Sequence, residues 1–344
     1  MTPSQPVSLI GMTKADLEKV VSDCSLPRFA AGQIARWIYL KRVTSIDEMT
    51  DISLAGRERL KLSYQVGREA PLLRTLSSDG TAKYLFRGVD GRNIEAVMIP
   101  DANRATLCVS SQAGCRMGCK FCLTGRGGFN GNLTAADIIN QVLSIEESEQ
   151  LTNLVFMGMG EPTDNVEAVM KAIEILTSPW GLAWSPRRIT LSSIGRIDIL
   201  RSIIEHTQVH IAISVHSPFP AERAEIMPVE KAYPVREVME MLRGYDWKHQ
   251  RRLSAEYIMW RGVNDSMHHA EALARLLKGT SCRVNLIRYH SIDGFDHQSS
   301  DRRVMEAFRD RLNELGVTAT IRASRGEDIM AACGQLAGSK TERG

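Results

Sequence analysis

The chain has 344 residues, 43% of them hydrophobic, which is enough for one large domain and a smaller appendage without disulfide staples. Its 43 Lys and Arg nearly balance 40 Asp and Glu, so global charge neither requires nor excludes a nucleic acid partner. Seven cysteines, an opening without signal-peptide features and the lack of a long apolar run argue against a secreted scaffold or a membrane protein. We therefore expect a protein of the reducing cytoplasm that does not enter a membrane.

Residues 1–70 are expected to form a small helical module. Thr13 is a candidate N-cap in TKADLEKVVSDC, where apolar residues recur at helical spacing before the break at Pro27. AAGQIARWIYLKR and LAGRERLKLSYQV repeat this pattern with several basic residues. The basic residues are Lys41, Arg42, Arg57, Arg59 and Lys61. They indicate either a positive face that docks RNA or an ordinary solvated surface.

Residues 71–100 are expected to form a β-hairpin that links this module to the rest of the chain. TAKYLFRGVDGRNIEAVMIP alternates around Asp90-Gly91, a pair typical of a two-residue hairpin turn. ATLCVSS follows as a further β-branched strand and contains Cys108.

Strands and helices alternate beyond residue 130. Strand candidates are LTNLVFMGMG, RRITLSS, VHIAISVH, RLSAEYIMW, CRVNLIRYH and TATIRA, with amphipathic stretches such as NVEAVMKAIEIL between them. This pattern predicts an α/β fold over residues 101–330, with a parallel sheet closed or partly closed as in a β/α barrel. In such a sheet the chemistry lies at the carboxyl ends of the strands. Residues 331–344 form a C-terminal segment that contains Cys333.

The strongest chemical signal is CRMGCKFC, a C-x3-C-x2-C group formed by Cys115, Cys119 and Cys122. Three thiolates at this spacing can hold three irons of a cubane cluster and leave the fourth iron open to substrate. A structural zinc site is the alternative, but it needs four closed ligands, and the closest other cysteine lies upstream on a strand. The spacing favours the iron-sulfur cluster. A zinc-stabilised RNA-binding protein without catalysis is the competing hypothesis from another class.

At these residues the sequence resembles the radical S-adenosylmethionine (SAM) enzymes. Those enzymes have an aromatic residue just before the last cysteine, and Phe121 of this sequence fits that pattern. The resemblance implies a partial, TIM-like (β/α)6 barrel with an N-terminal accessory domain. It also implies a [4Fe–4S] cluster whose open iron binds SAM and whose reduced form yields a 5′-deoxyadenosyl radical. GMGEP ends the next strand, where glycine lets backbone approach a ligand and an acid can pair with the methionyl ammonium. Gly160 and Glu161 are the residues in question.

A narrower resemblance, to the RlmN/Cfr family of RNA methyltransferases, extends from about residue 95 to residue 338. It is carried by LCVSSQAGCRMGCKFCLTGRGGFNGNL, FMGMGEP, SPRRITLSSIG, AISVHSP, EYIMWRGVND, VNLIRYH and RASRGEDIMAACGQLAG. It implies methylation of adenosine C2 in 23S rRNA at the peptidyl-transferase centre and in tRNA beside the anticodon. Methylation at adenine C8, the Cfr reaction, is the alternative, although GMGEP and SRGED favour the C2 branch.

The family resemblance assigns roles to three residues. The first is Cys333, whose sulfur receives the methyl group of one SAM molecule. The radical from a second SAM removes hydrogen from that methyl group, and the methylene carbon adds to C2. Cys108 then takes the C2 proton and forms a disulfide with Cys333 as product leaves. Glu95 matches the family's proton acceptor and competes for the same proton. Without the resemblance, both cysteines would more often be small buried hydrophobes and Glu95 a solvated strand residue.

The resemblance also implies cofactor and partner contacts. Residues at strand ends that match SAM-contacting positions are Ser192, Ser214, Val215, His216 and His290, the last at a position usually filled by Asn. Candidate phosphate contacts are Arg187, Arg188, the run from Lys248 to Arg252, Arg322 and Arg325, each with solvated surface as the alternative. We expect two SAM per turnover, an electron donor such as flavodoxin, and a monomer.

Overall fold

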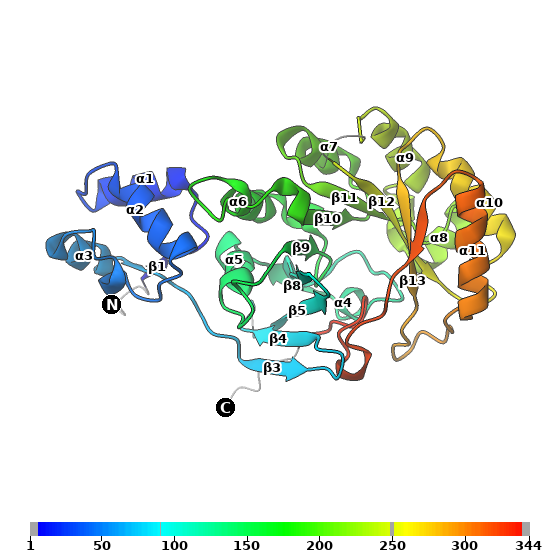
Figure 1. Cartoon of the computed structure of the whole chain (residues 1–344), viewed down its shortest axis with the longest axis horizontal. Helices are drawn as coiled ribbons and strands as arrows, with labels where there is room; N and C mark the ends of the chain where they lie inside the picture. The colour runs from blue at the N-terminus through cyan, green and yellow to red at the C-terminus, as the bar shows by residue number, and fades with distance from the viewer. Residues whose placement is uncertain (1–5, 90, 248–250, 339–344) are drawn as a thin grey trace.

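The computed structural model of the protein describes residues 6–89, 91–247 and 251–338, and places a small helical module at one end of a barrel-like body (Figure 1). Asp90 of the predicted turn, residues 248–250 of the basic run and residues 339–344 of the C-terminal segment lie outside the described residues. The module comprises β1 (Val7–Ser8), α1 (Lys14–Asp23), α2 (Ala30–Ala35), a π-helical turn (Arg36–Leu40), a 3-10 turn (Ile46–Glu48), α3 (Leu54–Lys61) and β2 (Tyr64–Gln65). None of the helices in the described ranges is long and apolar enough to cross a bilayer.

The module begins as its sequence predicts. Thr13 is the N-cap of α1, accepting a hydrogen bond from the Asp16 amide in a capping box, and the apolar residues of α1 are buried. The module packs closely on the body, since a Cβ at Gly11 would lie 2.2 Å from the amide nitrogen of Ala136. Much of the predicted positive face serves contacts within the module. Lys61, for example, pairs with Asp47 and Glu58.

A ten-stranded sheet forms the body, in the order β14-β13-β12-β11-β10-β9-β6-β5-β4-β3. The strands are β3 (Leu73–Leu76), β4 (Ala82–Phe86), β5 (Ile94–Asp101), β6 (Arg104–Cys108), β9 (Asn153–Phe156), β10 (Ile189–Ser193), β11 (His210–Ser214), β12 (Leu253–Met259), β13 (Arg283–Arg288) and β14 (Ala319–Ile321). From β6 through β9 to β14 all pairings are parallel, whereas β3, β4, β5 and β6 pair antiparallel. A separate two-stranded sheet joins β7 (Gln112–Gly114) and β8 (Phe129–Asn132) around the cysteine motif.

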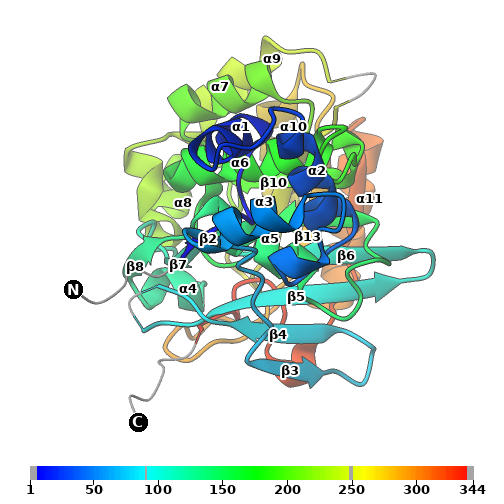
Figure 2. The ribbon, with the colours of Figure 1, turned by 90° about the vertical axis from the view of Figure 1, so that its left-hand side faces the viewer.

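Helices follow the parallel strands and cover one face of the sheet (Figures 1 and 2). They are α5 (Ala135–Leu143), α6 (Val166–Thr177), α7 (Ile197–His206), α8 (Pro220–Ile226), α9 (Val235–Arg243), α10 (Met267–Leu277) and α11 (Arg302–Glu314). The short α4 (Leu123–Arg126) follows the cysteine motif and contacts the C-terminal segment instead. Strands β6, β9, β10, β11, β12 and β13 are each followed by such a helical connection, with β14 as a short last strand. The predicted partial (β/α)6 barrel with an N-terminal accessory domain is confirmed.

The connection between β4 and β5 agrees with the predicted tight turn at Asp90-Gly91, although Asp90 itself lies outside the described residues. The Arg92 amide donates to the Val89 carbonyl at 3.0 Å across these two residues, and Phe86 of β4 pairs with Ile94 of β5. Within this connection the chain folds back on itself, since a Cβ at Gly88 would lie 2.0 Å from the carbonyl oxygen of Arg92. Strands β3 to β5 therefore extend the main sheet as an antiparallel edge, and the division of the chain at residues 70, 100 and 330 stays a prediction.

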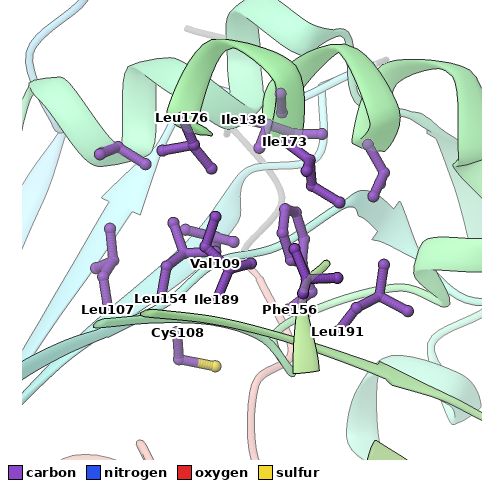
Figure 3. Close-up of a cluster of buried hydrophobic side chains, with 14 of the residues drawn as sticks. Leu107, Cys108, Val109, Ile138, Leu154, Phe156, Ile173, Leu176, Ile189 and Leu191 are labelled. Carbon is purple, nitrogen blue, oxygen red and sulfur yellow. The ribbon is translucent and has the colours of Figure 1, made fainter. Parts of the chain in front are cut away.

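The hydrophobic core lies between the sheet and the helices. Because the neighbours of Cys108 on β6 point into this core, Cys108 points to the opposite face of the sheet. Successive residues of a strand point to opposite faces. Figure 3 shows side chains of β6, β9 and β10 pointing towards α5 and α6, while Cys108 points away from the helices. The core side chains are Leu107, Val109, Leu154, Phe156, Ile189, Leu191, Ile138, Ile173 and Leu176, all buried. Burying each large aliphatic or aromatic group contributes about 1.5–3 kcal/mol.

Candidate active site

Cys108 lies at the carboxyl end of β6, on the concave side of the sheet. Strand pairing sets it opposite Val97 of β5, and Val97 opposite Lys83 of β4, so the three side chains point to one face. Glu95, two residues before Val97, shares that face. Burial, with a smaller contribution from the nearby Cys333, raises the pKa of the Cys108 thiol to about 12.

Cys333 lies beside the predicted cluster loop although about 210 residues separate the two in the chain. The carbonyl of the next residue, Gly334, accepts a hydrogen bond from Leu123 at 2.8 Å, and a Cβ at Gly334 would lie 2.9 Å from the carbonyl oxygen of Phe121. The Cys333 side chain reaches solvent, yet desolvation by the surrounding protein raises the pKa of its thiol while the charge of Arg322 opposes the shift. All seven cysteines are free thiols.

The loop with the three predicted cluster ligands is fixed by backbone hydrogen bonds. The Cys115 amide donates to Gly128 and the Cys122 amide to Cys119, at 3.0 and 3.2 Å. Burial raises the pKa of the Cys115 thiol to about 12 and that of Cys119 well above its ordinary value, and neighbouring thiols reinforce both shifts. Raised pKa values mean that the thiolate forms are unstable in this loop without a nearby positive charge. A bound iron centre would supply that charge.

The donor set fits an iron-sulfur cluster, because three thiolates are soft ligands and all three line one loop. Within the described part of the chain, no group of three or more His, Cys, Asp or Glu side chains is close enough to enclose a single metal ion.

The His216 side chain packs against the cysteine loop, and its contact with SAM stays a prediction. Its Nδ1 accepts a hydrogen bond from the Ile258 amide at 3.0 Å, and its ring lies edge-on to Phe121 with centroids 4.9 Å apart. Burial lowers the pKa of His216 to about 3, so the ring is neutral. His216 also has a positive φ of 57°.

The GMGEP segment shows why glycine is needed there. At Gly160, which has φ +97°, a Cβ would lie 2.5 Å from Cβ of Gln112. The close neighbour of Gly160 is thus the protein's own Gln112, and its approach to a ligand stays a prediction. The Glu161 carboxylate accepts hydrogen bonds from Thr163 and from the Ile194 amide, and burial raises its pKa. Its pairing with a methionyl ammonium stays a prediction.

The other predicted SAM contacts lie at the strand ends on the open side of the barrel. Ser192 and Ser214 are partly exposed on β10 and β11. The carbonyls of Ser214 and Val215 accept hydrogen bonds from the fully buried Arg223, at 2.8 and 3.0 Å, which holds this edge rigid. His290 hydrogen-bonds Ser324 at 3.1 Å, and burial lowers its pKa.

Glu95 is in contact with the C-terminal segment. One carboxylate oxygen accepts hydrogen bonds from the amides of Ala337 and Gly338 at 2.9 and 3.0 Å, and the other lies 3.1 Å from Nζ of Lys83. Sequence patterns do not predict this contact, because Glu95 and Ala337 are more than 240 residues apart in the chain.

The candidate phosphate contacts fall into two groups. Arg322 lies inside the barrel opening, where its guanidinium is 3.4 Å from the buried Glu256 and its charge acts on both Cys108 and Cys333. Arg187 and Arg188 precede β10, and Arg251 and Arg252 precede β12. These four therefore lie at the amino ends of the strands, opposite the carboxyl ends that carry the candidate site. Arg325 lies 3.9 Å from Asp101.

Comparison with known proteins identifies the family. Residues 109–276 match the family model described as Radical SAM superfamily, and residues 7–66 match the Ribosomal RNA large subunit methyltransferase N-terminal domain. A Bacteroides fragilis protein named probable dual-specificity RNA methyltransferase RlmN is 54% identical over 334 residues, covering 97% of each chain.

Two further relatives agree. The dual-specificity RNA methyltransferase RlmN of Pseudomonas fluorescens is 38% identical, covering 99% of this chain and 92% of that one. The crystal structure of a radical SAM methyltransferase from Sphaerobacter thermophilus superposes with a TM-score of 0.90 at 38% identity, covering 96% of this chain and 99% of that one. The chain is an RNA methyltransferase and belongs to the RlmN family of the radical SAM superfamily.

Proposed function

We propose that the chain methylates C2 of adenosine in 23S rRNA and in tRNA, with Cys333 as the methyl carrier. The observation that supports this most directly is the hydrogen bond between Leu123 and Gly334, which holds the Cys333 segment against the cysteine loop. C2 of adenine is electron-poor, so transfer of a methyl cation to it would fail and a radical route is needed.

Three cysteines would hold one [4Fe–4S] cluster: Cys115, Cys119 and Cys122. The residues that would surround SAM are Gly160, Glu161, Ser192, Ser214, Val215, His216 and His290. When bound, the cluster and two SAM per turnover supply an electron, a methyl group and a hydrogen-abstracting radical. Buried hydrogen bonds already fix Glu161 and the Ser214–Val215 carbonyls, so these residues would meet the cofactor with little rearrangement.

In the proposed reaction Cys333 loses its thiol proton to water and its sulfur accepts a methyl group. That methyl carbon would then give up a hydrogen atom to the radical derived from the second SAM and form a bond to C2, so that protein and RNA are covalently joined. The adduct carries one unpaired electron, which the iron-sulfur cluster would accept when bound. Cys108 takes the C2 proton, with Glu95 as the competing acceptor. The sulfur of Cys108 then attacks the sulfur of Cys333 and forms a disulfide. The bond between the Cys333 sulfur and the methylene carbon breaks with its electron pair on carbon, and that carbon takes up a proton to become the methyl group of the released base. An external donor must reduce the disulfide before the next turnover.

The RNA has to present an unstacked adenosine to the barrel opening, which favours loops of structured RNA. The N-terminal module is the proposed docking platform. A flavodoxin-like electron donor and a monomeric state complete the proposal.

Anaerobic incubation of the reconstituted enzyme with labelled SAM, a reductant and either ribosomal RNA or tRNA tests the function. Mass spectrometry of digested nucleosides should detect 2-methyladenosine from both RNAs. Formation of 8-methyladenosine would assign the chain to the Cfr reaction instead. A preparation that binds zinc and shows no iron-sulfur absorption would refute the radical mechanism.

A further inference from the structure

The segment that carries Cys333 is bound along one edge of the sheet by side chains of β4, β5 and the turn between β3 and β4. At its start, the Gly326 amide donates to Asp79 at 3.0 Å, and Asp328 accepts hydrogen bonds from Ser77 and the Ser78 amide. This first attachment precedes Cys333 in the chain. Figure 1 shows the segment, in red, running beside β3 and β4.

A second attachment follows Cys333 and depends on a single ion pair. Glu95 accepts the Ala337 and Gly338 amides on one oxygen, and its other oxygen faces Lys83 at 3.1 Å. Lys83 also donates to the carbonyl of Met330 at 3.3 Å. Both side chains are largely shielded, 18% exposed for Lys83 and 11% for Glu95. The ion pair thus binds backbone on both sides of Cys333.

The backbone between the two attachments has little freedom to place Cys333 elsewhere. Gly338 has φ +63°, and a Cβ there would lie 2.2 Å from the carbonyl oxygen of Asn93, so the segment lies directly against β5. The Leu336 carbonyl accepts a hydrogen bond from Thr124 at 2.5 Å on the opposite side. The position of Cys333 is therefore set by β5 on one side and by the cysteine loop on the other.

We propose that Lys83 and Glu95 form a docking site for the Cys333 segment, and that Glu95 acts as a positioning residue while the segment is docked. The inference rests on the proposed function, in which Cys333 carries the methyl group. It has a chemical consequence, because the oxygen that accepts two amides has no lone pair directed at a base to be modified. Because the other oxygen faces Lys83 and keeps only one further lone pair, docking and acceptance of a proton from RNA compete for the same carboxylate.

Two substitutions of Glu95 separate positioning from proton acceptance. Glu95→Ala removes the acceptor. Glu95→Gln keeps an oxygen for the two amides but cannot take up a proton at neutral pH. Glu147→Ala is a matched control, because Glu147 binds Arg74 and the hydroxyl of Tyr84 in the same strands without contacting the segment.

The first measurement is amide hydrogen exchange of the full chain, which needs no activity. Glu95→Ala should speed exchange at Ala337 and Gly338 about ten-fold or more, since hydrogen bonds to a charged acceptor are lost. Glu95→Gln should speed it less, and Glu147→Ala should leave it as in the wild type. Unchanged exchange in Glu95→Ala would overturn the docking site.

The second measurement is transfer of labelled methyl from SAM to Cys333 in the absence of RNA. Docking predicts a several-fold loss in Glu95→Ala that Glu95→Gln largely restores. If Glu95 is only a proton acceptor, neither variant changes this step and both slow product formation from RNA equally, which would refute positioning. Wild-type protein that never labels Cys333 would refute the proposed function, while the exchange experiment would still decide whether the segment docks on Glu95.

Discussion

The backbone amide of Leu123 donates to the carbonyl oxygen of Gly334 at 2.8 Å. These residues directly follow Cys122 and Cys333, so one hydrogen bond connects the proposed cluster loop to the proposed methyl carrier. Gly334 has φ +85°, a conformation that L side chains rarely adopt, and its Cα hydrogen faces the Phe121 carbonyl.

Gly334→Ala should therefore disturb this connection. A Cβ 2.9 Å from the Phe121 oxygen forces the segment away from the loop, so methylation of Cys333 should fall about ten-fold while iron content is kept. Gly316→Ala is the control, because Gly316 has φ +81° but nothing within 4 Å of its Cβ. Both variants carry about 1–2 kcal/mol of left-handed strain, so equal losses in the two would show that the contact does not matter.

The three loop cysteines should be needed for iron. Alanine at Cys115, Cys119 or Cys122 removes one of three thiolates, and we expect loss of most iron and sulfide after anaerobic reconstitution. Cys24→Ala and Cys282→Ala provide controls, since both thiols are buried away from the loop. Full iron content in the loop variants would place the cluster elsewhere.

Cys333→Ala should abolish RNA methylation and leave the cluster intact. Because the substitution removes only the proposed carrier, reductive cleavage of SAM to 5′-deoxyadenosine should continue. Liquid chromatography of the adenosyl product and nucleoside analysis of the RNA measure the two steps separately. Normal methylated RNA from this variant would exclude Cys333 from the reaction.

Cys108→Ala should stall the reaction after protein and RNA have been joined. Without the second thiol no disulfide can form, so a covalent adduct should persist on a denaturing gel and disappear with ribonuclease. Release of unlinked methylated RNA at the wild-type rate would contradict a resolving role for Cys108.

His210 should make the fold less stable in mild acid. Burial, together with neighbouring guanidinium groups, lowers the pKa of His210 to about 4, against about 6.5 in an unfolded chain. Between these values only the unfolded chain takes up the proton, so stability falls as pH drops from about 6.5 to about 4 and this contribution then levels off.

His210→Gln should reduce that pH dependence, since glutamine can still accept the hydrogen bond that the Arg252 amide donates to Nδ1. Melting temperature measured across this pH range tests the prediction, with the exposed His206→Gln as control. The slope should not vanish, because the buried His216 has a pKa of about 3 and contributes in the same direction. An unaltered slope in His210→Gln would argue against the prediction.

Local sequence patterns were sufficient for the elements but not for their long-range contacts. The N-cap at Thr13 and the strand-helix alternation follow from hydrogen bonding and periodicity within a few residues, and both are confirmed. The tight turn predicted at Asp90-Gly91 is equally local and agrees with the hydrogen bond from the Arg92 amide to the Val89 carbonyl at 3.0 Å, although Asp90 itself lies outside the described residues.

The cluster motif is also local, whereas the surroundings of Glu95 and Arg322 are not. Glu95 meets residues more than 240 positions away, and Arg322 lies 3.4 Å from Glu256, while its contact with RNA phosphate stays a prediction. Composition and spacing carry no information about such encounters, because they depend on which strands the barrel makes adjacent.

Strand β6 pairs with β9 along one edge and with β5 along the other, so both of its edges are saturated. β6 therefore has no free edge at which β14, the last strand at the other end of the sheet, could pair and close the barrel. A barrel closed at β6 would lose the pairing of β6 with β5, and with it the strands that carry Glu95 and Lys83. The opening of the ring and the surface that contacts the C-terminal segment therefore depend on the same strand pairing.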